Sequence, residues 1–247
     1  MENELRALSK NKVQEYNDNG FIVVPGLLSR DEYREFVDHV EDIRYGRKKV
    51  DWYEPMDPDT TEMKRFHHRW FNRHRVDPLQ MHYLKLPRVR DILWDIMGAE
   101  PVGLQSMVFF KPSGFPGQAY HQDSKYITTE PESLHASWIA LDDVDEDNGC
   151  MYAIPGSNNG EIMPDGPIRD TDEHEDWTTE SVGVEFEKEE PLCVEAGDAI
   201  FFHGRLLHRS KKNRSENRFR RAYACHYMAA EATTARKDLQ EKIKLSK

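Results

Sequence analysis

The chain has 247 residues and a mass of 29.0 kDa, and 38% of its residues are hydrophobic, which suffices for one domain with a sizeable core. Its formal net charge of -11 argues against a general nucleic-acid-binding role, because such a chain repels polyanions. No run approaches the roughly 18 apolar residues of a membrane span, so we expect neither nucleic acid nor membrane as a partner.

The cysteines indicate a reducing compartment. Cys150, Cys193 and Cys225 are odd in number and far apart, which argues against a disulfide framework. No apolar stretch typical of a signal peptide follows Met1, and the chain does not end in Ser-Lys-Leu. We therefore expect a cytoplasmic protein.

Helical patterns dominate the first part of the chain. Residues 2–19 are rich in helix formers, and the apolar run 21–24 after them predicts a short buried strand. Ser29, followed by acidic residues and an apolar face of helical spacing, predicts a capped helix. A further helix is expected over residues 88–97, whereas residues 46–77 give no clear pattern.

From Val102 onward the pattern changes to short β-prone runs separated by turn residues, which favours a sandwich or barrel. The runs are residues 102–110, 119–123, 135–141, 150–154, 191–194, 198–202 and 219–227. No internal repeat or linker marks a second domain. The prediction is one domain over residues 1–247, with a helical part over about 1–100, an all-β core over about 102–228 and a C-terminal helix over 229–247.

His121 and Asp123 form a candidate metal-binding pair. They are two residues apart in a run expected to be a strand, where such side chains project from one face roughly 7 Å apart at Cα. Alone this spacing is common, and a histidine on a strand is more often a surface or packing residue. A distant second imidazole would complete the facial triad that leaves positions open on Fe(II). His203 and His208 are the candidates for it, and Arg220 follows on the last β-prone run.

Several motifs occur in a characteristic order. They are residues 19–29, Lys111-Pro112, His121-Gln122-Asp123, residues 138–142, Asn148-Gly149-Cys150, residues 154–157, Phe201-Phe202-His203, His208 and Arg220-Arg221-Ala222. This ordered set, which covers most of the chain, resembles the phytanoyl-CoA dioxygenase family of Fe(II)/2-oxoglutarate oxygenases. The resemblance implies a double-stranded β-helix, a cupin-like jelly roll with helices packed outside.

The resemblance also implies roles for particular residues. The iron ligands would be His121, Asp123 and His208, with family position favouring His208 over His203. Arg220 would anchor the distal carboxylate of 2-oxoglutarate, because a permanently charged planar guanidinium holds a carboxylate bidentately.

Trp138 and Met107 fall where the family lines its co-substrate pocket, although ordinary core roles fit them equally well. Some relatives carry a hydroxyl two residues after the anchoring arginine, where this chain has Ala222. Arg69 and Arg73 are therefore alternative donors to the distal carboxylate.

Other polar motifs are given no chemistry. The pair His67-His68 is flanked by aromatic residues and could contact the substrate, but we favour a packing or solvent-exposed role for it. Asn148-Gly149 and Pro155-Gly156 are expected to form turns. The acidic residues 142–147 lack the pattern of a calcium loop and are expected to form a solvated turn.

The expected activity is oxidation by Fe(II), 2-oxoglutarate and O2, with ascorbate as an auxiliary reductant, and its usual outcome is hydroxylation of an unactivated C–H bond in a small molecule. Asp123 disfavours halogenation, because it occupies the coordination position that halogenases leave for chloride. Two alternatives remain open: a jelly-roll protein that binds metal or ligand without turnover, and a cupin-like metal oxygenase that does not use 2-oxoglutarate. Arg220 argues against the latter. The sequence does not identify the substrate or the oligomeric state.

Overall fold

Short strands and a few helices make up the computed structural model, which describes residues 4–55 and 68–245. The helices are α1 (Lys10–Asn19), α2 (Arg30–Arg44), η1 (Arg73–Arg75), α4 (Pro78–Leu84), α5 (Pro87–Met97), α6 (Asp123–Tyr126), η2 (Ser157–Asn159), η3 (Phe186–Lys188) and η4 (Lys237–Leu239). The strands are β1 (Phe21–Val24), β2 (Arg69–Phe71), β3 (Pro101–Lys111), β4 (Thr129–Glu130), β5 (His135–Ala140), β6 (Met151–Ala153), β7 (Asp165–Gly166), β8 (Glu180–Ser181), β9 (Glu190–Leu192), β10 (Ala199–His203), β11 (His208–Ser210), β12 (Arg220–Ala229), β13 (Thr233–Thr234) and β14 (Ile243–Lys244).

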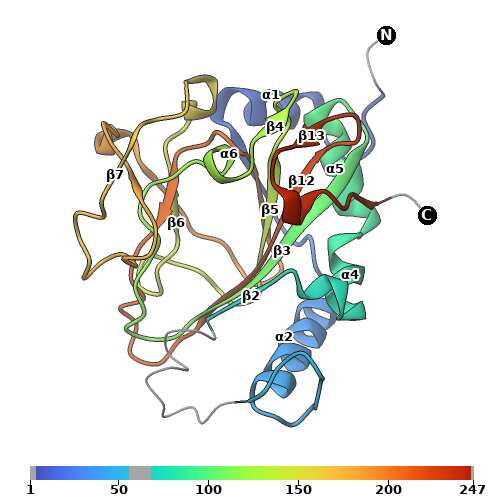
Figure 1. The fold of residues 1–247 in the computed structure, drawn as a ribbon, viewed down its shortest axis with the longest axis vertical. Helices are drawn as coiled ribbons and strands as arrows, with labels where there is room; N and C mark the ends of the chain where they lie inside the picture. Colours follow the sequence, from blue (N-terminus) through green and yellow to red (C-terminus); the bar gives the residue numbers. More distant parts are fainter. Residues whose placement is uncertain (1–3, 56–67, 246–247) are drawn as a thin grey trace.

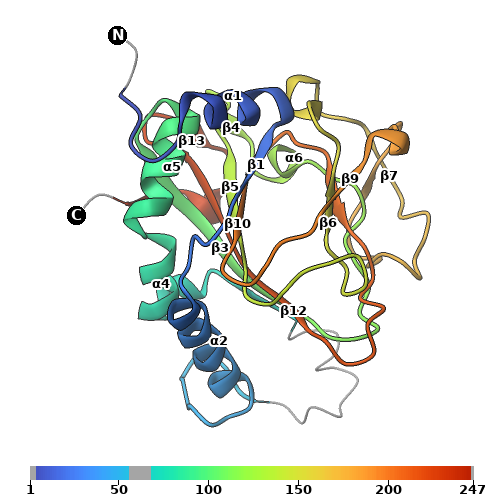
Figure 2. The same cartoon turned by 180° about the vertical axis from the view of Figure 1, so that it is seen from behind.

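Two antiparallel sheets of unequal size form the jelly roll. The larger sheet has the order β1-β10-β5-β12-β3-β14, with β2 also paired to β3, and the smaller has the order β11-β6-β9. Helices α1, α2, α4 and α5 lie along one side of the large sheet, and the small sheet lies on its other side (Figures 1 and 2). This confirms the predicted all-β core with flanking helices in a double-stranded β-helix.

The side chains of strand β12 point alternately into two parts of the core. Tyr223 and Tyr227 belong to the core between the large sheet and the helices, whereas Ala222 belongs to the core between the two sheets. Because side chains alternate along a strand, residues in phase with Ala222 face the inter-sheet space. Arg220 and His226 are in phase with it, and both line a cavity there.

Two helices begin close to their sequence signals. Helix α2 starts after Ser29, whose side chain and backbone exchange hydrogen bonds with Glu32 in a capping box. Helix α5 starts at Pro87, one residue before the expected range. Among the helices of the described residues, none combines the length and apolar character that a bilayer crossing requires.

The first helix is shorter than the expected range of 2–19. It begins at Lys10, with Ser9 as the N-cap. The backbone amides of residues 6–8 donate to the carboxylate of Asp95 on α5, at 2.7–2.8 Å. Because this carboxylate satisfies three successive amides, the segment is held against α5 in a non-helical conformation.

The C-terminal tail is not the helix expected over 229–247. It forms β13, η4 and β14, and its Leu239 and Leu245 are buried. Strand β14 pairs with β3 at Val102 and Gly103, beyond the part of β3 that β2 covers. Backbone groups at this sheet edge need partners, and the tail supplies them, which outweighs the helix propensity of its charged residues.

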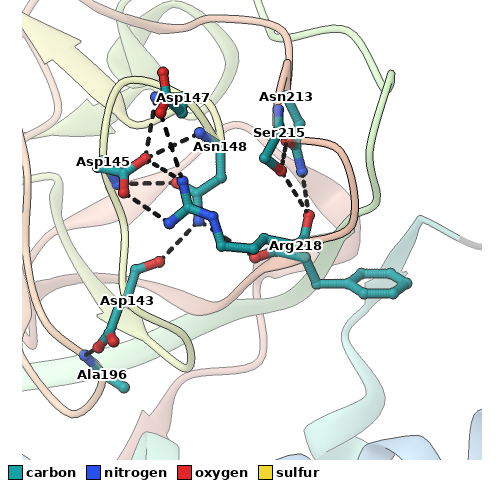
Figure 3. Close-up of polar contacts among 9 residues, drawn as sticks. Asp143, Asp145, Asp147, Asn148, Ala196, Asn213, Ser215 and Arg218 are labelled. Atoms are coloured by element: carbon teal, nitrogen blue, oxygen red, sulfur yellow. Dashed lines mark hydrogen bonds and ion pairs between the residues drawn. The ribbon is translucent and has the colours of Figure 1, made fainter.

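A buried asparagine holds the beginning of β12 (Figure 3). Asn148 donates through Nδ2 to the carbonyls of Asp143 and Phe219, at 2.8 and 3.3 Å, and its Oδ1 accepts from the amide of Asp145 at 2.9 Å. Arg218 forms a bidentate ion pair with Asp145, at 2.7 and 2.8 Å. The turn predicted here therefore also ties the acidic loop to the segment before Arg220.

A second buried asparagine acts on the same segment. Asn213 donates through Nδ2 to the carbonyl of Arg218 at 2.7 Å and to that of Lys111 at 3.0 Å. Lys111 is the β3 residue opposite Arg220. Asn148 and Asn213 thus fix the backbone just before Arg220 and that of the residue opposite it on β3.

We expect Asn148→Ala to lower the free energy of unfolding by about 2 to 4 kcal/mol, because it strips partners from buried backbone groups. Urea titration measures this change. Asp147→Ala is the matched control in the same loop: its side chain is 86% exposed, and we expect a change below about 0.5 kcal/mol. Equal stability of wild type and Asn148→Ala would contradict the view that Asn148 stabilises this part of the backbone.

Candidate metal centre and cavity

Three side chains with metal-binding atoms converge between the sheets. The ligand atoms of His121, Asp123 and His208 all lie within 4.8 Å of one another. Oδ1 of Asp123 is 3.5 Å from Nε2 of His121 and 3.9 Å from Nε2 of His208. All three residues are buried. Within residues 4–55 and 68–245, no other group of three such side chains has this geometry.

His121 and Asp123 do not share a strand face, contrary to the expectation for residues 119–123. His121 instead forms an isolated antiparallel bridge with His208, in which each amide donates to the other residue's carbonyl, at 3.0 and 3.1 Å. Asp123 is the first residue of the short helix α6. The bridge sets the two imidazoles side by side, and the turn into α6 brings in the carboxylate.

Backbone carbonyls orient both imidazole rings. Nδ1 of His121 lies 2.8 Å from the carbonyl of Ala119, and Nδ1 of His208 lies 3.0 Å from that of Leu206. Because a carbonyl can only accept, Nδ1 carries the proton and Nε2 presents a lone pair. Burial, reinforced by the neighbouring His208, lowers the pKa of His121 to about 3. His121 is therefore neutral at physiological pH, as metal ligation requires.

His226 holds the carboxylate of Asp123. Its Nε2 lies 2.9 Å from Oδ2, whereas Oδ1 is the oxygen nearest His121 and His208. Burial alone would raise the pKa of Asp123, but His226 and His208 keep it well below its ordinary value. His226 was not among the sequence predictions. The available signal was its even spacing from Arg220 along the last β-prone run.

Arg220 lies on the same cavity-facing side of β12. Its guanidinium stacks over Trp138, 5.4 Å from the ring centroid, and lies 6.0 Å from the centroid of Phe109. Burial, together with Arg69, lowers its pKa to about 10, so it stays charged at neutral pH. Among the described residues it has no ion-pair partner, and its Nε makes no hydrogen bond. A buried cation in this state is suited to an anionic ligand.

Lys111 and Ser210 line the cavity near Arg220. Nζ of Lys111 donates to Oγ of Ser210 at 3.1 Å, and this oxygen also accepts from the amide of Gln118 at 3.1 Å. Since Ser210 already accepts two hydrogen bonds, its own proton is directed to another acceptor. It can supply the hydroxyl that Ala222 lacks.

The two alternative anchors differ in position. Arg69 lines the cavity but is ion-paired to Glu175. Arg73 does not line the cavity and lies over Trp52, 5.2 Å from the ring centroid. Arg69 therefore has no unpaired charge for a carboxylate ligand, and Arg73 lies outside the cavity, so Arg220 is the better placed anchor.

The other predicted residues are distributed as follows. Trp138 and Met107 both line the cavity, which has a volume of about 490 Å³. His68 also lines it and packs on Phe115, with ring centroids 3.9 Å apart. His67 lies outside the described residues.

His203 stands apart from the metal-binding group. Its ring packs against His135, with centroids 5.1 Å apart, and its Nδ1 accepts from the amide of Arg205 at 3.1 Å. The geometry thus brings His208, and not His203, to His121 and Asp123.

Comparisons with known proteins identify relatives. A family profile described as Phytanoyl-CoA dioxygenase (PhyH) matches residues 16–222. Phytanoyl-CoA dioxygenase domain-containing protein 1 of Danio rerio is 34% identical over 172 residues, which cover 65% of this chain and 56% of that protein. The peroxisomal phytanoyl-CoA dioxygenase of Rattus norvegicus is 27% identical over 252 residues, which cover 92% of this chain and 70% of that protein. The chain thus spans little more than half the length of the first relative.

A solved structure has the same fold. EvdO2 from Micromonospora carbonacea var. aurantiaca, complexed with 2-oxoglutarate, superposes with a TM-score of 0.70. The two chains are 19% identical, and the match covers 96% of each.

We expect His226→Ala to weaken the binding of Co(II), a redox-stable probe, by about 10- to 100-fold, because Asp123 loses the donor that orients it. Competition with a chelator measures this affinity. His226→Gln keeps a donor and should lose less, and His203→Ala should bind as wild type does. Wild-type affinity in His226→Ala would show that Asp123 is oriented without this bond.

Proposed function

The chain belongs to the phytanoyl-CoA dioxygenase family, and on that premise we propose that it is a non-haem Fe(II)- and 2-oxoglutarate-dependent dioxygenase acting on a small molecule. One observation carries the proposal. A single cavity contains the group His121, Asp123 and His208 together with the buried, unpaired guanidinium of Arg220. The first suits a metal and the second a dicarboxylate.

The donor set fits ferrous iron. Two imidazoles and one carboxylate form the facial triad of non-haem Fe(II) oxygenases, which leaves positions for a co-substrate and O2. His121, Asp123 and His208 would hold the metal. Iron(II) with 2-oxoglutarate and O2 supplies an oxidant for an unactivated C–H bond, while 2-oxoglutarate is converted to succinate and CO2.

The protein's share is to bind and orient the co-substrate. Arg220 would hold the distal carboxylate, with Ser210 donating a further hydrogen bond. Trp138, Phe109 and Met107 line this part of the cavity and exclude water. In a dry site a charge-assisted pair is stronger than in solution.

Arg220 and the metal-binding residues also bear on the two alternatives, a cupin-like oxygenase without 2-oxoglutarate and a binding protein without turnover. A cupin-like oxygenase without 2-oxoglutarate has no use for a buried cation such as Arg220. A binding protein without turnover would keep the same geometry but produce no succinate. The carboxylate of Asp123 supports oxygenation over halogenation, because it fills the position that chloride would need.

The remaining proposals concern conditions in the cell. O2 is the proposed oxidant, and ascorbate the reductant that keeps iron ferrous. All three cysteines are free thiols, which fits a reducing compartment such as the cytoplasm. The rat relative is named peroxisomal, so imaging of the tagged full-length protein decides between the two.

Substitution of the ligands tests the activity. With Fe(II), ascorbate and 2-oxoglutarate, we expect wild type to form succinate, and His121→Ala, Asp123→Ala and His208→Ala to form less than about 1% as much, because each loses one of three protein donors. His203→Ala is the control and should retain activity. A metal-loaded wild type that forms no succinate would favour the binding-protein alternative, and active ligand variants would place the metal elsewhere.

Substitution of Arg220 tests the co-substrate site. We expect Arg220→Ala to raise the KM for 2-oxoglutarate about 30- to 150-fold, equivalent to about 2 to 3 kcal/mol, with little change in iron affinity. Arg221 is the control: it points to the other strand face, where it is ion-paired to Asp142 and Glu41. Arg221→Ala should lower stability and leave the KM near wild type. Equal KM values for the two variants would move the anchor elsewhere.

A further inference from the structure

Three aromatic side chains that line the cavity are also exposed, and they mark the part of it, here called the mouth, that opens to solvent. Phe71, Tyr126 and Trp177 are 46%, 37% and 58% exposed, and all three line the cavity although they come from separate segments. Single exposed aromatic residues are ordinary, but three that line one cavity give it exposed apolar surface of the kind found at ligand-binding sites. Their rings offer flat faces on which another ring can stack.

The charged side chains at this mouth are neutralised in pairs. Arg69, which also lies under the ring of Trp177, is ion-paired to Glu175. Arg236 forms a bidentate pair with Asp238, at 2.7 and 2.8 Å. Among the described residues, the mouth therefore offers no unpaired charge to a charged substrate.

The unpaired cation of the cavity lies elsewhere. Arg220 has no carboxylate partner among the described residues, and it lies opposite Lys111 in the β3–β12 ladder. Burial lowers the pKa of Lys111 well below its ordinary value, and its Nζ donates to Ser210 and to the carbonyls of Gly149 and Lys211. The proposed binding site for 2-oxoglutarate lies at Arg220. A substrate that enters through the aromatic mouth therefore meets paired charges, which favours a neutral molecule.

A neutral amide lies in the cavity wall near the metal centre. Gln105 on β3 is 8% exposed, and its side chain makes no hydrogen bond within the described residues. It lies opposite His226, whose Nε2 bonds to Asp123, so its amide is close to the metal centre. An amide that faces the cavity can both donate and accept, so it can hydrogen-bond to a hydroxyl or carbonyl oxygen of a ligand.

Resting on the proposed function, we propose that the substrate is an uncharged small molecule with a ring body and a hydroxyl or carbonyl oxygen. The ring stacks between Phe71, Tyr126 and Trp177, and the oxygen bonds to Gln105. The cavity volume of about 490 Å³ accommodates the co-substrate and a compact molecule of this kind.

Two probes with the same rings test the charge preference. Calorimetric titration is made into anaerobic protein loaded with Fe(II) and 2-oxoglutarate, and binding of both is measured in the same sample. We expect 2-naphthol to bind at least about 10-fold more tightly than the anion 2-naphthoate. Tighter or equal binding of 2-naphthoate, or binding of neither probe, overturns this inference and leaves the proposed function intact. Failure to bind iron and 2-oxoglutarate overturns both.

Variants test the assigned contacts. Trp177→Ala should weaken 2-naphthol binding about 5- to 20-fold. Phe186→Ala is the matched control, because Phe186 is 40% exposed but does not line the cavity, and it should bind as wild type does. Gln105→Met, a change of similar volume, should weaken 2-naphthol about 10-fold without changing 2-oxoglutarate affinity. Wild-type binding of 2-naphthol by Trp177→Ala and Gln105→Met would refute the contacts.

Discussion

The mutual hydrogen bonding of His121 and His208 is the constraint on which the site depends. Two backbone bonds between residues distant in sequence place two imidazoles beside each other. Their ring centroids lie 4.2 Å apart, close enough to share one ion. The other residues of the metal centre are placed relative to this bridge. The start of α6 directs the carboxylate of Asp123 toward the two imidazoles, and His226 on the large sheet binds that carboxylate.

Strand β12 connects the centre with the rest of the fold. One face of the strand anchors the helices through buried tyrosines, and Tyr223 and Tyr227 donate their hydroxyl protons to carbonyls of α4. The opposite face carries Arg220 and His226 into the cavity. Because both groups belong to one strand that is rigidly packed on its other side, the proposed co-substrate anchor and the support of the metal ligand keep a constant relation.

The sequence predicted which residues form the metal centre better than it predicted the secondary-structure elements that carry them. The spacing of His121 and Asp123 and the later arginine marked the residues that the structure brings together, since ligand chemistry depends on residue type. Asp123 nevertheless begins a helix, because the backbone of His121 pairs with a distant segment. The even spacing of His226 from Arg220 indicates the strand face on which it lies. Its partner Asp123 and the partners of Asp95 lie far away along the chain, so local patterns do not identify the roles of these two residues. The C-terminal tail was likewise predicted as a helix from its local pattern. Its pairing with the free edge of β3, which is distant in sequence, makes it a strand instead.

The central claim is that one cavity binds a metal and 2-oxoglutarate together. The direct test is anaerobic titration of 2-oxoglutarate into the protein with and without Fe(II), followed by calorimetry and visible absorption. The account predicts one equivalent bound to the Fe(II)-loaded protein, with a new charge-transfer absorption, and at least about 10-fold weaker binding without metal. Equal affinity with and without Fe(II), or metal binding with no uptake of 2-oxoglutarate, would contradict it.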